Sequence, residues 1–95
     1  MAPNRKMDRD RAESVAVSAF SYLAADDERL TRFLDLAGIR PDSIRAAASS
    51  PGFLAGVLDF VAAEEALLVD FAKSLDVPPE RIMEARYTLS PSEFE

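Results

Sequence analysis

Two stretches of the sequence, YLAADDERLTRF at residues 22–33 and FVAAEEALLVDF at residues 60–71, repeat one pattern 38 residues apart. Each carries two alanines, two acidic residues, a leucine and a phenylalanine at matching positions. With this offset, residues 14–47 align with residues 52–85, and seven of the 34 aligned pairs are identical. We interpret the pattern as an internal repeat of a three-helix unit. Chance similarity within an alanine-rich helical chain is the alternative.

The spacing of apolar residues is helical along the chain, and no segment alternates in the way that a strand does. It predicts an all-α fold, a compact bundle of five or six short helices in two similar three-helix halves. Gly38 is expected to end the second helix, since a left-handed cap favours glycine. Pro41 and Pro79 are expected to begin the third and sixth helices, and Ser50 with Pro51 the fourth.

The length of 95 residues corresponds to one domain. We expect a single helical domain over residues 8–89, with flexible ends at residues 1–7 and 90–95. The N-terminus MAPNRKMDRDR has no apolar segment, so a signal peptide is not expected. The longest nearly apolar run, residues 52–63, is too short to span a bilayer. The prediction is a cytoplasmic protein without a membrane partner.

The composition argues against the commonest catalytic chemistries. The chain contains no cysteine, histidine or tryptophan, which removes thiolate nucleophiles, thiolate metal sites and the usual base near neutral pH. No GxSxG, SxxK or phosphate-binding glycine loop occurs. We therefore expect no enzyme and no cofactor. The net charge is −6, and no lysine or arginine lies between Arg45 and Lys73, so no nucleic-acid partner is expected.

The acidic pairs Asp26/Asp27 and Glu64/Glu65 are the most conspicuous polar feature. Each pair falls where one predicted helix ends and the next begins. Carboxylates at such positions cap backbone N–H groups and complement the helix dipole. Paired carboxylates also bind divalent cations or share a proton, which is the alternative interpretation.

Two stripes of small residues occupy equivalent positions in the first and fourth predicted helices. Their spacing lets two helix backbones approach closely, and we expect the two helices to meet near these stripes about a pseudo-twofold axis. The other interpretation is that both stripes are the wetter faces of their helices. The stripes consist of Ser14, Ser18, Ser21 and Ala25, and of Gly52, Gly56, Asp59 and Ala63.

The function hypothesis is a non-catalytic protein–protein interaction or regulatory module with an apolar, acid-rimmed face. Apolar residues cover much of the circumference of the fourth predicted helix, and two short units are not expected to bury them all. The partner is an unknown protein, and self-association as a homodimer is one form of the hypothesis. The alternative function is a small carboxylate-based metal- or ligand-binding protein or hydrolase. The candidate partner-binding residues are Tyr22, Phe53, Leu54, Phe60 and Tyr87.

Within residues 28–72, three segments carry a resemblance: FLDLAGIRPDSIR at residues 33–45, SPGFLAGV at residues 50–57 and LDFVAAEEALLVDF at residues 58–71. They resemble a family of short alphaproteobacterial proteins known as domain of unknown function 3572. The resemblance implies a small helical cytoplasmic protein, and it brings no activity, cofactor or functional residue. Arg40 departs from the expected pattern, because a capping Ser, Asp or Asn would suit the following proline better.

Overall fold

A computed structural model describes residues 8–48 and 51–89 of the chain. These residues contain no strand, and the predicted all-α fold is confirmed. The Cα radius of gyration is 13.3 Å, close to the value of about 13 Å for a folded domain of about 100 residues. The elements are α1 (Arg9–Ala24), α2 (Asp27–Ala37), the short 3₁₀ helix η1 (Pro41–Ser43), α3 (Ile44–Ala48), α4 (Pro51–Ala63), α5 (Glu65–Leu75) and α6 (Pro79–Leu89).

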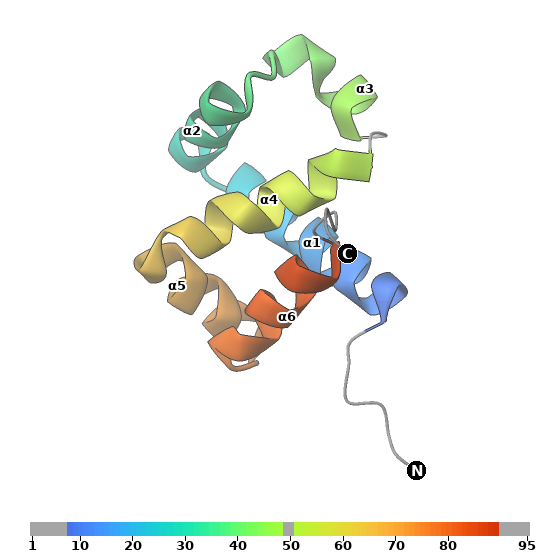
Figure 1. Cartoon of the computed structure of the whole chain (residues 1–95). Coiled ribbons are helices and arrows are strands. Elements are labelled where there is room, and N and C mark those ends of the chain that lie inside the picture. The colour runs from blue at the N-terminus through green and yellow to red at the C-terminus, as the bar shows by residue number, and fades with distance from the viewer. Residues whose placement is uncertain (1–7, 49–50, 90–95) are drawn as a thin grey trace.

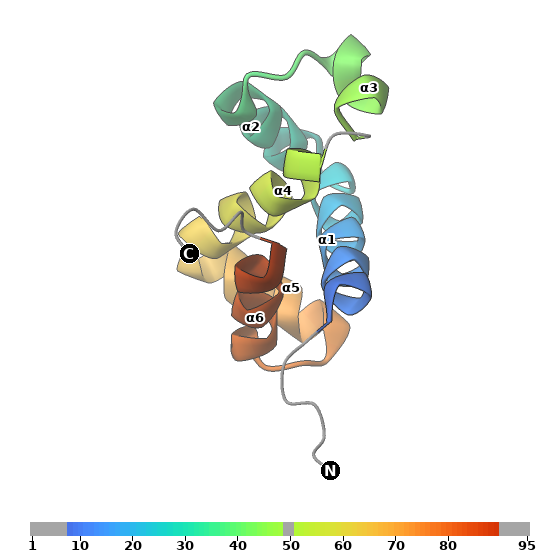
Figure 2. The same ribbon diagram turned by 45° about the vertical axis from the view of Figure 1, so that its right-hand side comes forward.

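Helix α4 runs across the middle of the molecule (Figure 1). Helices α2 and α3 lie on one side of it, and α5 and α6 lie on the other. Helix α1 packs against both α4 and α6 (Figure 2). The core therefore lies between α1, α4 and α6, with α2 and α5 closing its flanks.

The two halves are alike in element order and in the conformation of their helix ends. Helices α2 and α5 both have 11 residues, and their bounds differ by the 38-residue offset of the sequence pattern. Each follows an extended N-cap residue, Asp26 or Glu64. Each ends at a left-handed residue, Gly38 with φ 71° and Asp76 with φ 60°. The same backbone turn is thus made twice, once with glycine and once with aspartate, which tolerates this region better than most residues. The predicted cap at Ser50 lies outside the described residues.

Reciprocal aromatic contacts join the halves. The rings of Tyr22 in α1 and Phe71 in α5 have centroids 5.3 Å apart, and those of Phe60 in α4 and Phe33 in α2 are 5.5 Å apart. The offset of 38 residues converts Tyr22 into Phe60 and Phe33 into Phe71. Each contact is therefore the counterpart of the other with the halves exchanged, as an isologous interface requires. Both contacts thus join the two halves at positions related by the 38-residue offset.

Small residues do allow close packing of α1, but not the ones expected. The fully buried face of α1 carries Ala12, Ala16 and Ala19, with Leu23 at its end. Ser14 and Ser21 are exposed, as are Gly52, Asp59 and Ala63 on α4, and a Cβ added at Gly52 or Gly56 would meet no atom within 4 Å. The predicted meeting of the two stripes is wrong. The methyl groups of the alanine row bury without leaving a hydroxyl unpaired, so this row rather than the serines faces the core.

The third helices of the two halves differ. Helix α6 packs against α1, α4 and α5 and buries Ile82, Ala85 and Leu89. Helix α3 has five residues, none of them buried, and packs against α4. The counterpart of Leu89 is Pro51, the first residue of α4. At this position of the first half α3 has ended and the next helix has begun, whereas in the second half α6 still continues.

Within the described ranges, no single helix is both long and apolar enough to cross a bilayer. The consecutive segments Pro41–Ala48 and Gly52–Ala63 meet the length and composition criteria together, with a bend of 116° between them.

The identity of the packed stripe predicts the outcome of a pair of substitutions. Ala16→Leu places a larger side chain in a fully buried site and should lower the free energy of unfolding by about 1–3 kcal/mol. Ser14→Leu, on the exposed side of the same helix, should change it by less than about 0.5 kcal/mol. Urea denaturation followed by circular dichroism measures both. Equal losses in the two variants would show that the alanine row is not the packed face.

Candidate functional site

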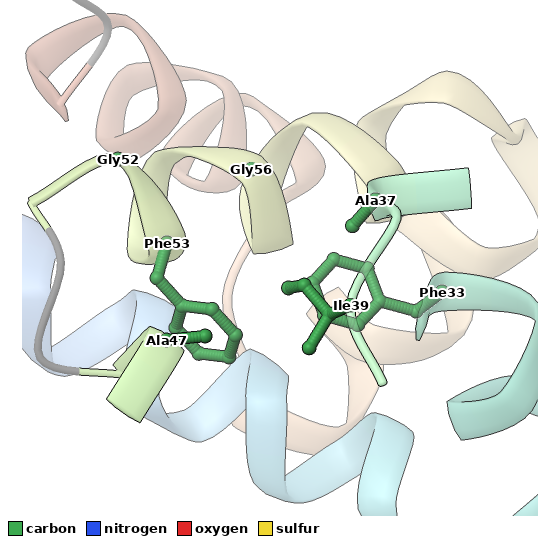
Figure 3. A pocket seen from close by; sticks show the side chains of 7 residues that line it. All are labelled: Phe33, Ala37, Ile39, Ala47, Gly52, Phe53 and Gly56. Atoms are coloured by element: carbon green, nitrogen blue, oxygen red, sulfur yellow. The ribbon is translucent and has the colours of Figure 1, made fainter. Parts of the chain in front are cut away.

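A surface groove of about 380 Å³ lies between α2, α3 and α4, and we call it the α2–α4 groove (Figure 3). One wall comes from α2 and the segment that follows it, the other from α3 and α4. Among the residues that the structure describes, every one that lines the groove is apolar or glycine, and none of these carries a charge or a side-chain hydrogen-bonding group. The lining residues are Phe33, Ala37, Ile39, Ala47, Gly52, Phe53 and Gly56.

Two aromatic rings anchor the groove in the core. Phe33 is 2% exposed and Phe53 is 7% exposed, and their ring centroids lie 5.8 Å apart in an edge-to-face arrangement. Phe53 also makes an edge-to-face contact with Phe20 of α1, at 5.3 Å. Such pairs add about 0.5–1.5 kcal/mol beyond the burial of their area. The aromatic part of the groove is therefore held by the same contacts that hold α1, α2 and α4 together.

Two glycines leave the backbone of α4 accessible on the groove side. Gly52 and Gly56 are four residues apart and lie on one face of the helix (Figure 3). A glycine inside a helix costs about 0.5–1 kcal/mol relative to alanine. At Gly56 no neighbouring atom lies within 4 Å of an added Cβ, so packing among the described residues does not account for this cost. The consequence is an open strip of helix backbone beside the aromatic rings.

The charges beside the groove are mixed rather than acidic. In the chain the lining residues are flanked by Asp35, Arg40 and Asp42, all exposed. Arg40 Nη2 lies 3.5 Å from Asp42 Oδ2, and both side chains are more than 70% exposed, so this ion pair contributes little to stability. The side chain of Arg40 makes no capping hydrogen bond to η1, which begins as a 3₁₀ turn at Pro41. The charges that flank the lining residues in the chain are therefore of both signs.

Of the predicted partner-binding residues, Tyr22 instead ties three helices together. Its hydroxyl donates a hydrogen bond of 2.6 Å to Asp70 Oδ2 in α5. The guanidinium of Arg29 in α2 lies 4.7 Å from the centroid of its ring. Burial of the ring and the hydrogen bond to Asp70 raise the pKa of Tyr22 to about 12, against a smaller opposing effect of Arg29.

The other four predicted residues differ in burial. Phe60 and Leu54 are half-buried against the core, and Phe60 lies under the Arg32 guanidinium at 5.9 Å. Phe53 is buried, contrary to the expected partial exposure, because its ring fills the space between Phe20 and Phe33. Tyr87 is 82% exposed on α6, and Phe53 is the one member of the predicted set that lines the groove.

The acidic pairs are used in helix starts and helix packing. Asp26 Oδ1 accepts hydrogen bonds from the backbone N–H groups of Glu28 at 3.0 Å and Arg29 at 3.3 Å, which confirms the predicted cap of α2. Glu64 occupies the equivalent position before α5 but makes no capping bond. Its Oε2 lies 2.8 Å from Arg32 Nη2 instead. Across residues 8–48 and 51–89, no three His, Cys, Asp or Glu side chains come close enough to hold a metal ion.

An all-α protein with an apolar groove beside its core is thus the class that the structure defines. The model of the family described as "Protein of unknown function (DUF3572)" matches residues 9–92, and the chain belongs to this family. Comparisons with curated proteins and with solved structures give no match. The family description assigns no activity.

The Tyr22 contact predicts a pH dependence. Burial and the hydrogen bond to Asp70 favour the protonated form of the Tyr22 phenol. The stability that this contact gives the fold is therefore complete below about pH 10, the pKa of tyrosine in the unfolded chain, and is lost as the pH rises to about 12. In a Tyr87→Phe variant Tyr22 is the single tyrosine, and absorbance titration reports its pKa alone. Adding Asp70→Asn should move that pKa downward. A phenol that ionises at the same pH with and without Asp70 would contradict the hydrogen bond.

The role of Gly56 predicts a second pair of variants. Gly56→Ala should raise the free energy of unfolding by about 0.5–1 kcal/mol, since the new methyl meets no neighbour and favours the helix. Gly38→Ala should lower it by about 1–2 kcal/mol, because Gly38 has a left-handed φ of 71°. Thermal and urea denaturation measure both changes. Destabilisation by Gly56→Ala would show that the fold itself requires this glycine.

Proposed function

We propose that this protein is a non-catalytic interaction module that binds an apolar segment of another protein in the α2–α4 groove. The observation that carries the proposal is the apolar lining that the described residues form, with the α4 backbone laid open by two glycines. A glycine that lowers helix stability without serving internal packing is explained if an external group occupies the space beside it.

The size of the groove supports a binding role. A volume of about 380 Å³ corresponds to roughly a dozen water molecules at about 30 Å³ each, far more than a packing defect between core side chains. Water in this groove finds no side-chain donor or acceptor among the described lining residues. Its displacement by apolar side chains is favourable, which is the driving force that we assign to the interaction.

The chemistry of the chain favours a protein partner over a substrate or a nucleic acid. The sequence has no histidine or cysteine, and Tyr22, whose pKa is clearly raised, is engaged in helix packing. Helix α4 carries no basic residue to neutralise a phosphate, and neither do the other lining positions of the groove. No arrangement of the described residues favours the carboxylate-based alternative.

A groove-blocking variant tests the proposal. Gly56→Glu should place a carboxylate in the groove while keeping a helix-compatible residue on α4. Val17→Glu is the matched control, because it puts the same group on α1 at a 54% exposed apolar residue outside the groove. Affinity capture from the native cell with quantitative mass spectrometry should show a protein retained by wild type and by Val17→Glu, but reduced at least about tenfold with Gly56→Glu.

Thermal denaturation of the purified variants must show that both remain folded. Sedimentation equilibrium of the purified wild type tests whether the partner is a second copy of the chain. A dimer that Gly56→Glu dissociates and Val17→Glu leaves intact would identify the partner as the protein itself. Partner capture unchanged by Gly56→Glu would contradict the assignment of the groove.

A further inference from the structure

We draw no further inference here: the strongest candidate, the apolar α2–α4 groove with the strip of α4 backbone left open by Gly52 and Gly56, belongs to the site already described, and nothing in the structure shows what covers it.

Discussion

The position of Pro51 constrains the rest of the structure. It begins α4 at the point where the other half continues through the last turn of α6 to Leu89. Helix α3 therefore stops after five residues and packs against α4, and α2 is not closed by a third helix in the way that α5 is. The α2–α4 groove follows from this difference, because α3 is shorter than α6 and packs against fewer helices.

Side-chain contacts between the two halves hold them together despite that difference. The Tyr22–Phe71 and Phe33–Phe60 contacts are reciprocal, and each has a polar neighbour: Asp70 accepts the Tyr22 hydrogen bond, and Arg32, its counterpart in the repeat, lies over Phe60. Arg86 Nε adds an exposed ion pair of 2.7 Å to Asp59 Oδ1 between α6 and α4. The aromatic burial outweighs these exposed pairs energetically, since ion pairs in solvent contribute about 0–1 kcal/mol.

Much of the fold could be predicted because its signals are local. Gly38 and Pro41 act on the backbone of one or two residues, and the structure places a helix end and a helix start at these positions. The acid at Asp26 acts over three residues, and its cap is present. Which of two similar faces of a helix is buried was harder to predict. The alanine and serine rows of α1 differ by a rotation of the helix, and only the neighbours α4 and α6 select the row that is buried.

For the candidate site, too, local features could be predicted from the sequence and burial could not. Sequence by itself determined the helical class and the order of the helices, since both follow from periodicity and capping within a short window. Tertiary structure alone decided that Phe53 is buried, that Tyr22 binds Asp70, and that Ala37, Ile39 and Ala47 face an open groove. The physical reason is that burial depends on which surfaces meet across 20 to 50 residues of chain. A helix pattern shows which side is apolar, and only the packed neighbours show whether that side is covered.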